Sequence, residues 1–287
     1  MEKIISRKGA KAQSDGPEPV IPSERFPACS EIYFLFLTLA SLRLCGIKIR
    51  IMVQPRNAST VVLLRPDDKG GFDILLTRRP ESMRFLGGFY VFPGGTVHRG
   101  DFSPAMLARC CNLDGARARQ ILGGHHDADE AIGHWVAVAR ELFEEVGILL
   151  AVGESGEAFI PIDAAARQRV EVKRQALVKQ ELDFADFLVS ESLYCDLAQA
   201  VYFDHWVTPD MYSMRFDTRF YVATLPPKQT PLLRSEEVTD SLWIKPAQAL
   251  ARMNRRDFPI LPPTTTVLSE LSRIPTWERL RERFGLE

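Results

Sequence analysis

The stretch that most constrains this chain is an amphipathic run from about residue 131 to residue 148. Its apolar residues recur at the spacing of one helix face: Ile132, Trp135, Val136, Ala139, Leu142, Phe143 and Val146. At about 100° per residue, three glutamates fall on the opposite side: Glu141, Glu144 and Glu145. Asp127 followed by Glu130 predicts a capped start, and Gly147 predicts the end. The run therefore predicts one helix with an acidic face.

Two interpretations of this acidic face compete. Acidic residues on a helix usually form a solvated face. Here, however, neighbouring carboxylates repel one another by a few tenths of a kcal/mol per pair, and only Arg140, one turn before Glu144, offsets this locally. A hard divalent cation would remove the repulsion, because Mg²⁺ prefers oxygen ligands and keeps waters and substrate phosphates in its shell.

Composition sets broad limits on the class of protein. The chain has 287 residues, a formal net charge of -1 and 46% hydrophobic residues, which suits one sizeable domain or two small ones. This near-neutral charge gives no indication of a nucleic-acid partner. Five scattered cysteines include no CxxC pair, which argues against a disulfide framework and favours a reducing, cytoplasmic location.

The N-terminal part differs from the rest of the chain. Residues 1 to about 30 are rich in polar residues, Pro and Gly, and we expect disorder there. The apolar run 32–42 is too short to span a bilayer and lacks the flanks of a signal peptide, so we expect no membrane span. Two interpretations of residues 1–51 stay open: a disordered extension, or a gene-model artefact ahead of a true start at Met52. The ordered domain is predicted at 52–287.

Strand patterns begin after residue 59. Residues 60–64 and 72–77 are short β-branched apolar runs joined by a turn, which predicts a hairpin. A third strand is predicted at 89–92 and ends in Pro93-Gly94-Gly95. Paired glycines permit close approach of the backbone. A strand, a Gly-Gly turn and an acidic helix together indicate a cradle for phosphate and metal.

Together these pieces resemble the Nudix hydrolases. The family motif is Gly, five residues, Glu, seven residues, then Arg-Glu-apolar-any-Glu-Glu-any-Gly-apolar. Gly95 opens the motif here, and residues 140–148 match its second half at every fixed position. There are two departures: Asp101 replaces the first Glu, and residues 102–139 stand where the family has seven. These departures leave the loop geometry, and therefore the substrate, open.

A second resemblance covers the residues before this motif. Coenzyme A diphosphatases of the same family carry Leu-Leu-Thr-any-Arg, then Arg, Gly and Phe-Pro-Gly-Gly at fixed spacing. The matching residues here are Leu75, Leu76, Thr77, Arg79, Arg84, Gly88, Phe92, Pro93, Gly94 and Gly95; Pro80 departs from the pattern. The long insertion also looks like the peroxisomal branch of these enzymes, although the C-terminus lacks a Ser-Lys-Leu address.

The resemblance implies an α/β fold, an α/β/α sandwich around a mixed β-sheet, with a helical insertion at 102–139, an arm at about 163–190 and C-terminal helices. It implies one or more Mg²⁺ or Mn²⁺ ions, and the metal ligands would be Glu141, Glu144, Glu145 and the carbonyl of Gly95. Arg140 would orient the glutamates. Substrate would be bound by Arg79, Arg84, Gly94, Gly95 and, as a weaker candidate, Glu237, while Phe92 is expected in the core.

The remaining segments have simpler predictions. Helices are expected at 102–122, 164–189, 246–253, after Pro262 and in the tail, and strands at 149–151, 202–208, 219–224 and 242–244. A separate metal site at His125, His126 and Asp127 is the weaker interpretation of that turn. His134 is expected to be a surface histidine.

Three hypotheses for function stay open. The first is metal-dependent hydrolysis of coenzyme A or an acyl derivative to 3′,5′-ADP and a 4′-phosphopantetheine product. The second is hydrolysis of another nucleoside diphosphate compound, such as ADP-ribose or a dinucleotide. The third is a nucleotide-binding sensor without turnover. In each case the partner is a small nucleotide, and the sequence assigns no oligomeric state.

Overall fold

The computed structural model describes residues 53–83, 86–160, 163–232, 234–235, 238–255 and 258–286. Both interpretations of residues 1–51 lie outside the described residues, as do Arg84 and Glu237. In the described part, the main sheet has seven strands, with β10-β2-β1-β9-β8 in order, β3 beside β2 and β4 beside β1. Its strands are β1 Arg56–Pro66, β2 Phe72–Arg78, β3 Tyr90–Val91, β4 Gly94–Thr96, β8 Ala200–Val207, β9 Phe216–Thr224 and β10 Asp240–Ile244.

The sheet is mixed, as predicted. β1 runs parallel to β9 over nine residue pairs, from Arg56 with Phe216 to Leu64 with Thr224. The β1–β2, β1–β4, β2–β3, β2–β10 and β8–β9 pairs are antiparallel. The predicted hairpin is therefore confirmed as β1 and β2.

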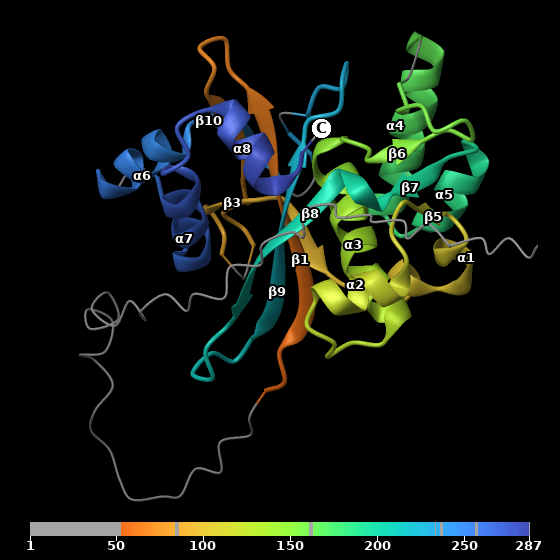
Figure 1. Cartoon of the computed structure of the whole chain (residues 1–287), viewed down its shortest axis with the longest axis horizontal. Coiled ribbons are helices and arrows are strands. Elements are labelled where there is room, and N and C mark those ends of the chain that lie inside the picture. The colour runs from red at the N-terminus through yellow and green to blue at the C-terminus, as the bar shows by residue number, and fades with distance from the viewer. Residues whose placement is uncertain are drawn as a thin grey trace, which may run out of the picture. The chain divides into compact units, whose positions relative to one another are not determined.

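Helices cover both faces of this sheet (Figure 1). One face carries α1 Pro104–Leu107, α2 Gly115–Ile121, α3 Ala128–Val146, α4 Ala164–Val178 and α5 Phe184–Ser190. The other face carries α6 Pro246–Asn254, α7 Pro262–Leu271 and α8 Trp277–Phe284. Because successive strand residues point to opposite faces, Val61 and Leu63 pack under α3, whereas Val62 and Leu64 pack under α7 and its neighbours. The predicted α/β/α sandwich is confirmed.

The predicted acidic helix is α3, and its ends follow the sequence signals. The Asp127 side chain accepts a hydrogen bond from the backbone N–H of Glu130 at 2.8 Å, which starts the helix three residues earlier than its apolar stripe suggests. Gly147 ends it with φ of 72°, a left-handed conformation that costs glycine little.

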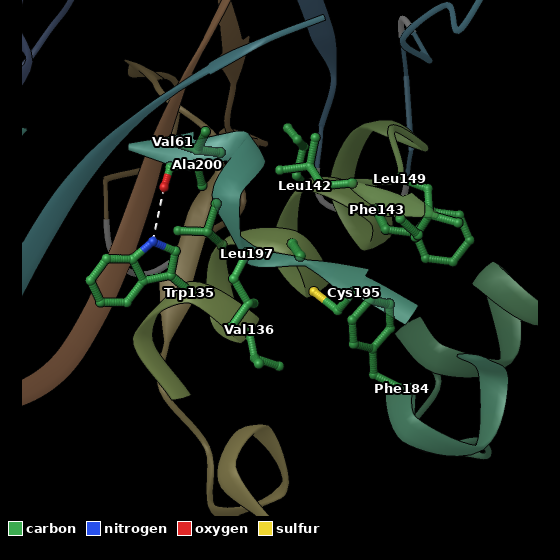
Figure 2. Close-up of a cluster of buried hydrophobic side chains, with 14 of the residues drawn as sticks. Val61, Trp135, Val136, Leu142, Phe143, Leu149, Phe184, Cys195, Leu197 and Ala200 are labelled. Atoms are coloured by element: carbon green, nitrogen blue, oxygen red, sulfur yellow. Dashed lines mark hydrogen bonds between the residues drawn. The ribbon is translucent and has the colours of Figure 1, made fainter. Parts of the chain in front are cut away.

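The core on the α3 side is drawn in Figure 2. Trp135 lies against β9 and η3 (Leu197–Gln199), and its Nε1 donates to the carbonyl of Ala200 at 2.8 Å. Further along α3, the ring of Phe143 stacks on Phe187 of α5 with 4.8 Å between centroids. Each large apolar side chain that α3 buries contributes about 1.5–3 kcal/mol. Because α3 buries several of them, it is the main apolar element of this layer.

Two predicted helices are wrong because caps and left-handed residues interrupt them. Residues 102–122 are not one helix but η2 (Arg99–Phe102), α1, strand β5 (Cys110–Cys111) and α2. Asn112 has φ of 65°, and Asp114 caps the new start of α2. Likewise residues 164–189 divide into α4 and α5, because Gln180 has φ of 58° and ends the first helix.

The other predicted elements are confirmed with small shifts in their bounds: β3, β8, β9, β10, α6, α7 and α8. The strand predicted at 149–151 is β6 (Ala151–Val152), which joins β7 (Tyr194–Asp196) and β5 in a small second sheet. The cysteines of the described residues, Cys110, Cys111 and Cys195, are free thiols. The helices described are each too short or too polar to cross a membrane. The domain boundary at residue 51 and the cytoplasmic location stay predictions.

Candidate active site

Arg140 is the centre of a buried ion-pair network on α3. Its Nε donates to one carboxylate oxygen of Asp101 at 2.7 Å, and its Nη2 donates to the other at 3.1 Å. Its Nη1 donates to Glu141 at 2.8 Å and to Glu144 at 3.1 Å. Nη2 also reaches the carbonyl of Thr96 at 3.0 Å. One guanidinium therefore ties together the acidic helix, the end of β4 and the residue just before the insertion.

The charges of this network act on one another. Burial lowers the pKa of Arg140, but the neighbouring Glu141 and Asp101 carboxylates outweigh it and raise that pKa, so the guanidinium stays charged. Burial raises the pKa of Glu144 to about 7; Arg140 opposes this shift and Glu141 reinforces it. Near neutral pH the Glu144 carboxyl is therefore close to half protonated, because Arg140 only partly offsets the effect of burial.

Asp101, which replaces the first Glu of the family motif, contacts Arg140 across the insertion. The carboxylate is 2% exposed and pairs with Arg140 in a two-pronged contact, although 38 residues (102–139) separate them. It also accepts the backbone N–H of His98 at 2.8 Å, within the capping box of η2. The insertion therefore leaves the site at η2 and includes the first part of α3, which brings the chain back to Arg140 and to its contact with Asp101.

The paired glycines bring the backbone against these carboxylates. Gly95 pairs with Ser59 of β1, and a Cβ atom built on it would lie 2.2 Å from Oε1 of Glu141. A Cβ atom on Gly94 would lie 2.4 Å from the carbonyl of Ser59, and its φ is 154°. Any side chain at either position would displace β4 or Glu141, so the absence of a Cβ is a steric requirement of the site.

The solvated-face interpretation of the three glutamates is wrong. Glu141 is 8% exposed and Glu145 is 7% exposed, while Glu144 is partly buried. The helical wheel places them correctly opposite the apolar stripe, but β4, η2 and α4 cover that side as well. Periodicity within one helix does not indicate what other segments cover it.

The donor set fits a hard divalent cation. Within the described part of the chain, no group of three or more His, Cys, Asp or Glu residues is already arranged around a common metal position. The available donors are nonetheless all oxygens, which suits Mg²⁺ or Mn²⁺. Glu144, with its pKa raised to about 7 by burial, is an acid that a cation would stabilise in its charged form. The backbone of Gly95 lies against Glu141 on the same side.

The predicted substrate-binding residues are only partly placed. Arg79 follows β2, where its backbone N–H and carbonyl bond to Phe89 and Gly88 at 3.0 Å each. Its Nε is buried without a hydrogen-bond partner among the described residues, which leaves a donor for a ligand. Arg84 and Glu237 lie outside the described residues. Phe92 is 3% exposed, which confirms its place in the core.

The expectation for His134 is wrong. It is completely buried, and its Nδ1 lies 3.0 Å from the Ser59 hydroxyl of β1. The ring of His126 lies 4.8 Å away, and Nδ1 of His126 contacts Glu130 at 3.1 Å. Burial, followed by the effect of His126, lowers the pKa of His134 to about 3, so the residue is neutral.

Sequence reasoning missed Arg174 of α4, whose Nη1 donates to the main-chain carbonyl of Glu144. A signal was available, because Val170, Arg174 and Leu177 follow the spacing of one helix face and all three are buried. The contact to α3, which is distant in the chain, has no sequence signal.

The fold and these residues define the Nudix class of proteins. The structure resembles the crystal structure of a Nudix hydrolase from Alicyclobacillus acidocaldarius, with a TM-score of 0.64, 27% identity, and coverage of 79% of this chain and 95% of that one. The NUDT19 Nudix domain family model matches residues 55–274, more than half of the chain. The chain belongs to this family.

Two relatives of this chain have names that state a substrate. The chain is similar to "Acyl-coenzyme A diphosphatase NUDT19" of Xenopus laevis, with 22% identity over 70% of this chain and 60% of the relative. The protein of the same name from Gallus gallus is 27% identical over 74% of this chain and 63% of the relative. "Putative nudix hydrolase 7" of Caenorhabditis elegans is 23% identical over 80% and 64%. The chain thus spans less than two thirds of the length of these relatives.

Proposed function

We propose that this protein is a metal-dependent Nudix diphosphohydrolase that splits coenzyme A or acyl-coenzyme A into 3′,5′-ADP and a 4′-phosphopantetheine product. The observation that carries the proposal is the Arg140 network, which gathers Asp101, Glu141 and Glu144 against the backbone of β4. A fold alone has no need for so many buried charges at one place, because burying them is costly unless they are paired.

The residue roles follow from the contacts and charges. Glu141, Glu144, Glu145 and the Gly95 carbonyl are the proposed ligands of Mg²⁺ or Mn²⁺; when bound, such an ion neutralises phosphate oxygens and lowers the pKa of a water. Arg140 holds two of these glutamates through its Nη1, at 2.8 Å from Glu141 and 3.1 Å from Glu144.

The substrate part of the proposal rests on the loop before the glycines and on the relatives. Among the described residues the buried Nε of Arg79 has no hydrogen-bond partner, and guanidinium groups bind phosphate oxygens in a fixed geometry. Arg84, Gly94 and Glu237 are further proposed substrate contacts. The relatives from Xenopus laevis and Gallus gallus are named as acyl-coenzyme A diphosphatases, which favours coenzyme A over other diphosphates.

Product analysis tests the proposal. The purified protein is given Mg²⁺ or Mn²⁺ with coenzyme A, ADP-ribose and diadenosine polyphosphates in parallel. We expect 3′,5′-ADP from coenzyme A, no product with Glu144→Gln, and full activity with Glu154→Gln, which changes an exposed glutamate. Arg79→Gln is expected to raise KM for coenzyme A.

Other outcomes distinguish the remaining hypotheses. Cleavage of ADP-ribose or a dinucleotide instead of coenzyme A would retain the diphosphohydrolase and reject the coenzyme A assignment. Nucleotide binding without cleavage at any metal concentration would reject the enzyme and favour a sensor.

A further inference from the structure

Arg174 is a buried arginine with every guanidinium nitrogen engaged. It lies on α4, is 3% exposed, and donates through Nη1 to the main-chain carbonyl of Glu144 at 2.5 Å. Its Nε and Nη2 bind the carboxylate of Glu171, one turn earlier on α4, at 2.9 and 2.8 Å. Burial of a charge is costly without such partners, so this contact fixes α4 to α3 at one defined place.

The end of α3 needs a cation from elsewhere. Three glutamates lie in its last six residues, and the last turn contains no basic residue. The negative end of the helix dipole disfavours these carboxylates, and the last carbonyl groups lack partners within the helix. Two distant segments donate hydrogen bonds to these carbonyl groups. The N–H of Leu232 donates to the carbonyl of Val146 at 2.8 Å, and Arg174 donates to the carbonyl of Glu144.

The side chain and the main chain of Glu144 are therefore each held by an arginine. Arg140 binds its carboxylate at 3.1 Å, while Arg174 binds its main chain. Because Glu145 is the next residue on the same turn, a shift of this main chain moves two proposed metal ligands together. We propose that Arg174 is a positioning residue that fixes the acidic turn of α3 for the cation, an inference that rests on the proposed function.

The direction in which metal affinity changes when Arg174 is lost distinguishes a positioning role from a purely electrostatic effect of its charge. A cation beside a metal site repels the metal, so loss of Arg174 acting only through its field would tighten metal binding. Loss of a contact that holds the ligands in place weakens binding instead, typically by 10- to 100-fold for residues that orient metal ligands. Glu171 already pairs with Arg174, so the field that this ion pair exerts at the metal site is small.

Mn²⁺ binding to the substrate-free protein measures this directly. We expect Arg174→Gln to raise the Mn²⁺ dissociation constant about tenfold and to lower kcat at saturating Mn²⁺ with little change in KM. Arg174→Lys keeps one donor and is expected to restore part of the affinity. Arg169→Gln is the matched control, since this exposed arginine of α4 pairs only with Glu191 among the described residues, and we expect parental affinity.

The outcomes separate this inference from the proposed function. Unchanged or tighter Mn²⁺ binding in Arg174→Gln, in a variant whose circular dichroism is parental, would overturn the positioning role even if coenzyme A is cleaved. If Arg174→Gln binds Mn²⁺ more weakly than the parent protein, and the parent cleaves no diphosphate, the positioning role is supported and the proposed reaction is rejected. If Arg174→Gln does not fold, Arg174→Lys against Arg169→Gln decides the same question.

Discussion

Lowering the pH should destabilise this protein through one buried histidine. His134 is completely buried between α3 and β1, with its Nδ1 3.0 Å from the hydroxyl of Ser59. Burial, then His126 and Arg219, lower its pKa from 6.5 to about 3; Asp217 works in the opposite direction and His205 adds to the lowering. In the unfolded chain the same imidazole takes up a proton near pH 6.5.

The sign follows from proton binding. Between pH 6.5 and 3 the unfolded state binds more protons than the folded state, so the free energy of unfolding falls as the pH falls. For a folded pKa of about 3, the stability that His134 contributes is present above pH 6.5 and drops by about 2 kcal/mol between pH 7.5 and 5.0. Below pH 3 the total loss approaches about 5 kcal/mol, comparable with the stability of a small domain.

Urea unfolding at a series of pH values checks this, with the parent protein compared to His134→Asn. The amide oxygen of Asn replaces Nδ1 as a partner for Ser59, but the side chain does not titrate. We therefore expect the variant to lose about 2 kcal/mol less free energy of unfolding than the parent between pH 7.5 and 5.0. His125→Asn, at an exposed histidine in the turn before α3, is expected to keep the parental dependence. Parallel curves for the parent and His134→Asn would refute the reasoning.

Three further predictions concern the site and the core. Asp101→Asn leaves the buried guanidinium of Arg140 without its two-pronged partner and should cost about 3–5 kcal/mol in urea unfolding, whereas an unchanged midpoint would contradict the contact. Gly95→Ala places a Cβ against Glu141 and should lower activity at least ~10-fold in a folded protein, while Gly100→Ala, with open space around it, should not; equal rates would reject the steric argument. Trp135→Phe removes the donor to Ala200 and should cost about 1–3 kcal/mol, measured by thermal unfolding; no change in Tm would show that the carbonyl finds another donor.

The sequence by itself determined the elements whose signals are local. The apolar stripe, Asp127 and Gly147 give α3 and its ends, because helix geometry repeats every 3.6 residues and caps act within one turn. Short apolar runs and turn signals likewise predicted β1, β2, β9 and β10. The motif gave two of the residues that contact Arg140, since Glu141 and Glu144 lie within one turn of it on the same helix.

Only the tertiary structure decided what covers each face. His134 is a buried histidine because β1 lies under it, and Glu141 is buried because β4 lies over it; neither strand is adjacent in sequence. Asp101 reaches Arg140 across the insertion, and Arg174 reaches Glu144 from α4. Burial and long-range contacts depend on how distant segments pack, whereas sequence periodicity reports only local geometry, so these contacts had no sequence signal.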